Sequence, residues 1–311
     1  MTFPKAPYHA DVAAGPPHGR AHWVTTADGI PIRIGVWPEG TRGTLLIVPG
    51  RTEYIEKYSD AAVRMAAHGY ASAVVDVRGQ GLSPRATGDR KIGHVNDFSE
   101  FQADVDGILD LCTELDMPRP WHILGHSMGG LIALRALMRR PAVFRRAVFS
   151  APMWGLQLTP HRRFMGWTVS AAAASLGFGE QSAPGSGKVA DPAGAPFDGN
   201  LLTRDAEMFA WMKRQITTHP DLALGGPSIG WVWAALREMH ACARAPAPVA
   251  PALTFLGTDE AIVSADAIHV RMGSWEDGTL EIIDGARHEA LMENAVLRTK
   301  IYDRIAAHLN G

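Results

Sequence analysis

The sequence predicts an α/β protein with a mostly parallel, doubly wound sheet, interrupted by a mainly helical insertion. Short apolar runs alternate with segments of helical periodicity before residue 150 and again after residue 252, which is typical of strand–helix–strand units. Between them, 151–245 breaks this rhythm and is rich in Trp, Ala and Gly. We therefore expect a core made of 1–150 and 246–311, with 151–245 as a cap. The 311 residues are enough for a core that buries about three quarters of the unfolded chain's surface.

The strands and helices are expected in a regular order. Residues 1–20, rich in Pro, Gly and His, indicate an extended arm. Two strands joined by the turn dipeptide Asp28-Gly29 follow, and a fully apolar run then ends at Pro49-Gly50, as in a strand buried on both faces. Strands are expected at 22–25, 32–37, 44–48, 72–75, 121–124, 147–149, 253–256 and 280–283. Helices are expected at 55–68, 98–115, 131–139, 264–272 and from 297 to 309.

Composition and charge exclude several classes of function. The net charge is −2, so the chain lacks the basic footprint of a nucleic-acid-binding protein. Cys112 and Cys242 cannot form a disulfide framework, and we expect two buried free thiols. Neither a signal-peptide-length apolar stretch at the start nor a run of 18 apolar residues occurs. We expect no transmembrane span and a cytoplasmic location; the oligomeric state is not indicated.

The motif GHSMG at 125–129 carries the chemistry. It follows an apolar run and precedes a helical pattern, as does a nucleophile on a tight strand-to-helix turn. Gly125 and Gly129 would leave room for that turn. Ser127 would then present its hydroxyl at the carboxyl end of the sheet, and the backbone N–H of Met128 could bind an oxyanion. The bare pattern is common, so its placement gives it weight.

A serine nucleophile needs a base and an acid that orients the base, in the chain order Ser, Asp or Glu, His on this type of turn. Asp259 and His288 each follow a late strand in such a turn, so we predict them as the acid and the base. Glu260 and Asp266 are the rival acids. The backbone N–H of Arg51, after the strand at 44–48, is the expected second oxyanion donor.

Neither a metal nor a cofactor is expected. His122 and His126 are four residues apart but lie on a strand, and no Cys/His cluster has zinc spacing. The segment GSGKV at 185–189 lacks the first glycine and the hydroxyl residue of a phosphate-binding loop.

Together with DVRGQGLS at 76–83 and GARHE at 285–289, these motifs resemble the α/β-hydrolase superfamily. Within it, PGRTEYIEKY at 49–58 resembles the branch of monoacylglycerol lipases and bacterial lysophospholipases, which usually carries His-Gly where this chain has Pro49-Gly50. The resemblance implies a lid over an acyl pocket, and places Glu53 and Lys57 around a glycerol group. Their alternative interpretation is a helical i,i+4 ion pair.

We therefore predict a serine carboxylester hydrolase that acts on a single-chain lipid ester without a cofactor. Trp154, just after a core strand, is the tryptophan best placed to bind the acyl chain. The same serine chemistry could instead serve a peptidase of N-terminal proline, a lactonase, a carbon–carbon hydrolase or an acyltransferase. A non-catalytic binding module is a further alternative.

Overall fold

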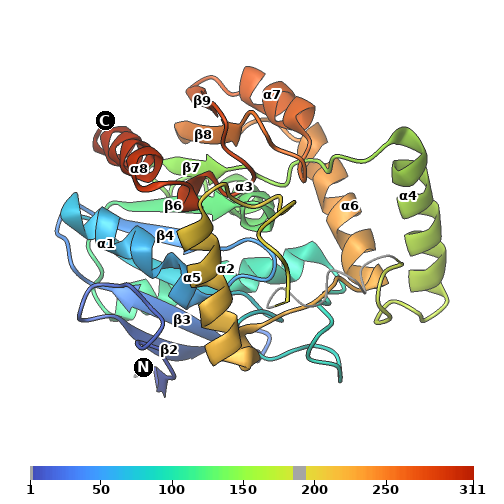
Figure 1. Ribbon diagram of the computed structural model, residues 1–311, viewed down its shortest axis with the longest axis horizontal. Helices are drawn as coiled ribbons and strands as arrows, with labels where there is room; N and C mark the ends of the chain where they lie inside the picture. The colour runs from blue at the N-terminus through green and yellow to red at the C-terminus, as the bar shows by residue number, and fades with distance from the viewer. Residues whose placement is uncertain (1–2, 185–193) are drawn as a thin grey trace.

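A nine-stranded sheet forms the centre of the computed structural model, which describes residues 3–184 and 194–311 (Figure 1). Its strand order is β1-β2-β3-β5-β4-β6-β7-β8-β9. The strands β1 to β3 and their junction with β5 are antiparallel, and all pairs from β5 to β9 are parallel. The strands are β1 (Lys5–Ala6), β2 (Arg20–Thr25), β3 (Pro31–Trp37), β4 (Thr44–Val48), β5 (Ala71–Asp76), β6 (Trp121–His126), β7 (Ala147–Ser150), β8 (Ala252–Gly257) and β9 (Gly278–Ile283).

Helices cover both faces of the sheet, which explains the apolar runs of the central strands. In β4, Leu46 and Val48 face one hydrophobic cluster while Leu45 and Ile47 face the other, as the pleat requires. The first cluster contains side chains of α2 (Phe101–Glu114), α3 (Met128–Arg139) and α7 (Ala265–Gly273). The second contains side chains of α1 (Ser59–Ala67) and α8 (Ala295–Asn310).

The expected fold class and the expected strands and helices of the core are confirmed, with differences at the starts of three helices. The helix expected at 98–115 begins as a 3₁₀ turn, Phe98–Glu100, before α2. The helix expected at 55–68 begins as a 3₁₀ turn, Ile55–Tyr58, before α1. The helix expected from 131 begins three residues earlier, at Met128, because the turn at Ser127 leads directly into it. The buried free thiols Cys112 and Cys242 are also confirmed.

The chain between β7 and β8 contributes three α-helices in its described part, α4 (Pro160–Ser175), α5 (Ala206–Thr218) and α6 (Ile229–Arg244). Figure 1 shows α4 and α6 side by side at one end of the molecule, while α5 crosses its front. The side chains of Trp231, Ala235 and Met239 on α6 belong to the same hydrophobic cluster as α3. This segment therefore shares the core of the sheet, and its status as a separate cap stays a prediction. The GSGKV segment lies outside the described residues.

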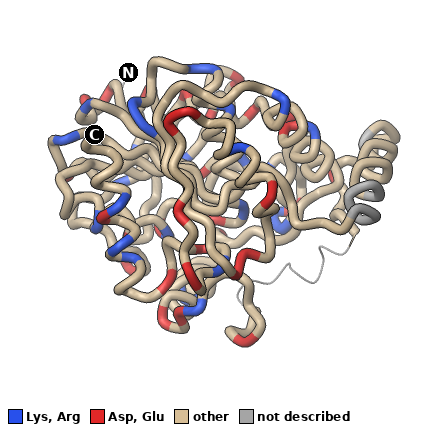
Figure 2. Tube along the Cα trace, turned by 90° about the horizontal axis from the view of Figure 1, so that it is seen from above, with Lys and Arg blue, Asp and Glu red and all other residues tan. Residues whose placement is uncertain are grey.

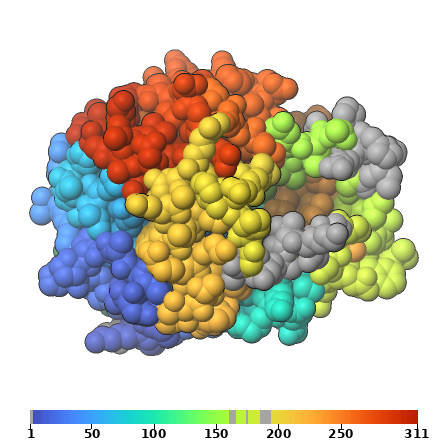
Figure 3. Space-filling model, viewed as in Figure 1, coloured from blue at the N-terminus to red at the C-terminus, as the bar shows by residue number. Residues whose placement is uncertain are grey.

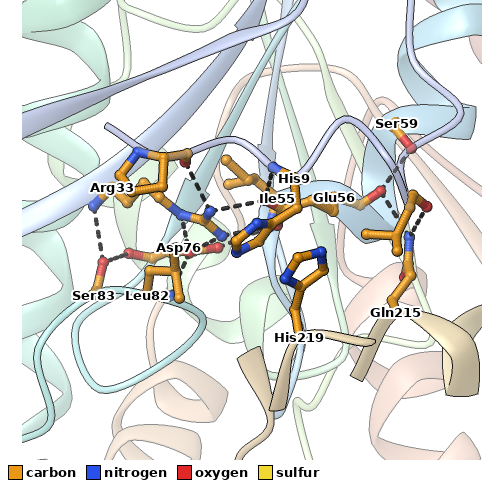
Figure 4. Close-up of polar contacts among 12 residues, drawn as sticks. His9, Arg33, Ile55, Glu56, Ser59, Asp76, Leu82, Ser83, Gln215 and His219 are labelled. Atoms are coloured by element: carbon orange, nitrogen blue, oxygen red, sulfur yellow. Dashed lines mark hydrogen bonds and ion pairs between the residues drawn. The ribbon is translucent and has the colours of Figure 1, made fainter. Parts of the chain in front are cut away.

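The N-terminal arm and a buried ionic cluster connect β3, β5 and α5. Arg33 hydrogen-bonds Glu56 with two nitrogens, both at 2.8 Å, and Asp76 at 2.7 Å, and all three side chains are fully buried (Figure 4). The backbone N–H of His9 in the arm donates to Glu56 at 3.1 Å. The side chain of Gln215 on α5 donates to the carbonyls of Val12 and Glu56. The arm thus fastens α5 to the core.

The described residues contain no helix that is long and apolar enough to cross a membrane. Acidic and basic positions are interspersed along the chain (Figure 2). In the space-filling view, the yellow part of the chain around α5 lies over the middle of the face shown, and the surface is hollowed between it and the green α4 (Figure 3).

Candidate active site

Ser127 occupies the turn between β6 and α3 with φ 50° and ψ −118°. A non-glycine residue with positive φ is strained, so the surroundings must hold it there. The two glycines of the motif make this turn possible. A Cβ on Gly129 would collide with the carbonyl of Val48, and one on Gly125 would lie 2.5 Å from the carbonyl of Gly129. The serine side chain is half-buried at the carboxyl end of the sheet.

His288 follows β9 and is held by an acid from the loop after β8. Its Nδ1 donates to Oε2 of Glu260 at 2.8 Å, and the two side chains are 5% and 2% exposed. The other oxygen of Glu260 accepts from the backbone N–H groups of Ile262 at 2.6 Å and Val263 at 3.0 Å. Burial raises the pKa of this carboxyl, but the His288 contact and the two backbone donors outweigh burial and lower the pKa. Glu260 is therefore an ionised acceptor that orients the imidazole.

The structure places Glu260 at His288, where the sequence analysis predicted Asp259. The Asp259 carboxylate is 38% exposed and pairs with Arg204, away from the imidazole. Its backbone N–H donates to Ala286 at 3.0 Å, which turns the side chain outward, and the next residue points inward. The sequence of this turn contains two adjacent acids. Only the direction of the backbone determines which of the two side chains faces His288.

Ser127 and His288 follow strands that end at the same edge of the sheet, because β6, β7, β8 and β9 are parallel. The ring of His126, next to the serine, lies 5.0 Å from the ring of His288 between centroids. In the described part of the chain no hydrogen bond reaches the hydroxyl of Ser127. Catalytic hydrogen bonds are often long without substrate and shorten in the reacting complex. The roles of Ser127 as nucleophile and of His288 as base stay predictions.

Two backbone N–H groups near the serine have no acceptor among the residues described, those of Arg51 and Met128. Met128 is the first residue of α3, where an N–H has no partner within the helix and the helix dipole favours negative charge. The side chain of Arg51 turns away and donates to the carbonyl of Gly225 with two nitrogens, at 2.6 and 2.7 Å. Burial lowers the pKa of this guanidinium to about 10. The side chain of Arg51 thus contacts the segment before α6, and its role as an oxyanion donor stays a prediction.

Glu53 and Lys57 form a buried ionic cluster beside this site. The Lys57 ammonium lies 2.5 Å from Glu53 and 2.6 Å from Glu289, the residue after His288. Tyr58 also donates to Glu53, at 2.6 Å. Burial opposes ionisation of Glu53, but Lys57, His126 and these hydrogen bonds lower its pKa to about 2. The i,i+4 ion pair is thus present, with Glu289 as a third member.

The three ionic residues also line a cavity of about 110 Å³, whose other walls include Leu202, Phe209, Met212 and Ile216. Binding of substrate by Glu53 and Lys57 stays a prediction.

Two groups in the described chain have ligand atoms close enough together for a metal ion. The first is Glu53, His126 and Glu289, where the Lys57 ammonium already bridges the two carboxylates. The second is His9, Asp11 and His219, where His219 pairs with Asp11 at 2.9 Å and the two imidazoles stack at 3.6 Å. Parallel stacked rings do not direct their lone pairs at one point. Neither group is arranged as a metal site.

Trp154 lies against the start of α3. Its Nε1 donates to the carbonyl of Gly130 at 3.2 Å, and its ring contacts Phe149 and Trp275. The side chain also lines a cavity of about 160 Å³ whose apolar walls include Trp167, Leu236 and Met239. Contact of Trp154 with an acyl chain stays a prediction.

Comparison with known proteins gives a consistent result. The model of a family described as serine aminopeptidase, S33, matches residues 39–295. Lysophospholipase L2 of Escherichia coli K12 is 29% identical over 303 residues, 92% of this chain and 86% of that protein. The probable lysophospholipase L2 of Haemophilus influenzae is 30% identical over 278 residues, 88% and 86% of the two chains. Among solved structures, a soluble variant of monoglyceride lipase from Saccharomyces cerevisiae has a TM-score of 0.73 at 19% identity, over 98% of this chain and 99% of that chain.

Proposed function

Since this chain belongs to the serine aminopeptidase S33 family and has the α/β-hydrolase fold, we propose that it hydrolyses single-chain lipid esters through an acyl-enzyme on Ser127. One observation carries the proposal: a strained serine turn and an oriented His288–Glu260 pair lie at the same edge of a parallel sheet. A structural serine would need neither the strain nor the buried pair.

In the proposed reaction, His288 removes the hydroxyl proton as the oxygen of Ser127 attacks the ester carbonyl. The N–H groups of Arg51 and Met128 bind the oxyanion that forms. The tetrahedral intermediate collapses, the bond to the alcohol breaks, and His288 gives its proton to the leaving oxygen. Water, deprotonated by His288, then attacks the acyl-enzyme. The bond between the acyl carbon and the oxygen of Ser127 breaks, and His288 returns the proton to that oxygen, which releases the fatty acid and restores the serine. Glu260 keeps the proton on Nδ1, so that Nε2 is the nitrogen that accepts and donates protons.

The proposed substrate class draws on the names of the relatives and on the cavities. Two relatives that span most of this chain are named as lysophospholipases, and a structural neighbour is named as a monoglyceride lipase. Each name refers to a glycerol ester with one acyl chain. Here, Trp154, Leu236 and Met239 line an apolar cavity, and the cavity beside Lys57 has both charged and apolar walls. An acyl chain and a polar glycerol moiety would suit these two environments.

The test is hydrolysis of lysophosphatidylcholine and monooleoylglycerol by the wild type and Ser127→Ala, together with labelling by a fluorophosphonate. We expect the variant to lose about 10⁴-fold or more in kcat and to escape labelling. Ser150→Ala is the matched control: it removes a buried hydroxyl without a hydrogen-bond partner, at the end of the neighbouring strand. Hydrolysis of aminoacyl amides or lactones in preference to both lipids would contradict the proposed substrate class.

A further inference from the structure

We propose that Gln80 is a positioning residue that holds the backbone of the oxyanion loop, residues 50–52, in its working orientation. This inference rests on the proposed function. Gln80 lies in the turn after β5 and is 3% exposed. Among the described residues, its side chain hydrogen-bonds to Gly50 and Thr52 and to neither Ser127 nor His288. It acts, in our proposal, only through the peptide units on either side of Arg51.

Both the oxygen and the nitrogen of the Gln80 side-chain amide form hydrogen bonds with this loop. Its oxygen accepts from the N–H of Thr52 at 2.6 Å, and its nitrogen donates to the carbonyl of Gly50 at 3.0 Å. The carbonyl of Gly50 and the N–H of Arg51 belong to one planar trans peptide unit. In such a unit the two groups point in opposite directions. Holding the Gly50 oxygen toward Gln80 therefore aims the Arg51 N–H away from Gln80 and leaves it free to donate to an oxyanion.

The loop needs such a restraint because its conformation is unfavourable. Thr52 has φ 70°, which is rare for a β-branched residue and costs on the order of 1–3 kcal/mol. The N–H of Gly50 is held separately by the carboxylate of Glu53. Without the Gln80 contacts, rotation of the peptide units flanking Arg51 would relieve the strain and turn the donor out of position.

Gln80 is itself rigidly placed. Its N–H donates to the carbonyl of Val77 at 3.0 Å, closing the turn. Next to it, Gly81 has φ 51° and no room for a Cβ, because one would collide with the carboxylate of Asp76. Asp76 belongs to the buried cluster with Arg33 and Glu56 and also accepts from the N–H of Leu82 (Figure 4). A fixed support of this kind is what keeps an oxyanion donor in place during the reaction.

The glutamine side chain meets the chemical requirement of this position. The position needs one acceptor and one donor at the same time. In Gln80→Glu the carboxylate could still accept from Thr52, but it would face the Gly50 carbonyl with lone pairs. In Gln80→Met both bonds are lost at nearly the same side-chain volume.

The experiment measures kcat, KM and inhibition by an alkyl trifluoromethyl ketone, which forms a tetrahedral adduct with the serine. Removing one oxyanion donor costs about 10²–10³-fold in kcat, so misplacing one should cost about 10–10³-fold. For Gln80→Met and Gln80→Glu we expect kcat to fall by this factor, KM to change less than about threefold, and the inhibition constant to rise in parallel with the loss of kcat/KM. For Gln80→Met the pH dependence of kcat should keep its shape, because the His288–Glu260 pair is untouched. For Gln80→Glu the loss should be largest at high pH, where the new carboxyl is ionised and cannot donate to the Gly50 carbonyl.

Gln102→Met is the matched control. Gln102 is also buried and also uses both ends of its amide, with the carbonyl of Ile132 and with Arg140, but it contacts no residue of the oxyanion loop. We expect it to lower stability without changing kcat. If Gln80→Met does not fold, the isosteric Gln80→Glu carries the test.

A folded Gln80 variant with wild-type kcat would overturn the inference, and so would a loss of kcat with unchanged inhibition by the ketone. The proposed function fails separately, if the wild type neither cleaves esters nor reacts with a fluorophosphonate.

Discussion

Replacing Glu260 by Gln tests the assignment of the acid by inverting one hydrogen bond. Oε1 of Glu260 accepts from two backbone N–H groups, at 2.6 and 3.0 Å, so the amide oxygen of a glutamine must take that place. The amide nitrogen then stands where Oε2 accepts from His288 at 2.8 Å. It can only donate, so Nδ1 must lose its proton and Nε2 must hold it. The imidazole is then in the tautomer that cannot accept the serine proton.

The corresponding change in serine proteases costs about 10⁴ in kcat, and each factor of ten corresponds to about 1.4 kcal/mol, so we expect a barrier higher by about 5 to 6 kcal/mol in Glu260→Gln. Asp259→Asn, which changes an exposed carboxylate one residue away, should stay within about threefold of the wild type. The assay is steady-state hydrolysis of a chromogenic ester, with thermal unfolding to confirm that both variants are folded. Near-wild-type turnover by Glu260→Gln, or a collapse in Asp259→Asn, would refute the reasoning.

Three further outcomes follow from the buried groups and the cavities. Lys57→Met leaves Glu53 and Glu289 buried without their cation, and we expect a loss of about 3–5 kcal/mol in the free energy of unfolding, measured with urea. Because the pKa of Glu53 is lowered from 4.5 to about 2 in the native state, its contribution is present above pH 4.5 and lost as pH falls toward 2. Urea titrations across that range should show this loss for the wild type and a smaller one for Glu53→Gln. Each buried methylene contributes about 0.8 kcal/mol, so kcat/KM should rise from acetate to octanoate esters, and Trp154→Ala should flatten the rise; a flat wild-type profile would contradict an apolar acyl site.

The core could be predicted from periodicity because its central strands are buried on both faces and its helices carry one apolar stripe. The segment 44–48 has no polar residue after Thr44, and the structure shows why, with side chains alternating between two hydrophobic clusters. The assignment to the α/β-hydrolase superfamily is confirmed by the family match and by the fold. The cytoplasmic location and the division into core and cap stay predictions.

What the sequence could not decide depends on backbone direction and on contacts between distant segments. Asp259 and Glu260 are adjacent acids in one turn, and only the hydrogen bond of the Asp259 N–H to Ala286 shows which side chain faces His288. Sequence reasoning did not find a role for Gln80, because its two partners lie about 30 residues earlier, in another loop. Its position between Gly79 and Gly81 was the one signal available in the sequence, and the structure shows that both glycines have positive φ.

The hydrogen bond from Gln215 to Val12 joins positions 203 residues apart in the sequence. The position of α5 therefore depends in part on the N-terminal arm. Closing a contact of such long range costs chain entropy, and elements held by few such bonds open before the rest of the protein. Amide hydrogens of α5 and of the arm should therefore exchange with deuterium at similar rates, faster than those of β4 and β6. A protease that cleaves the arm near Ala10 would accelerate exchange in α5 while the sheet stays protected, and the wall of the cavity beside Lys57 would loosen with it.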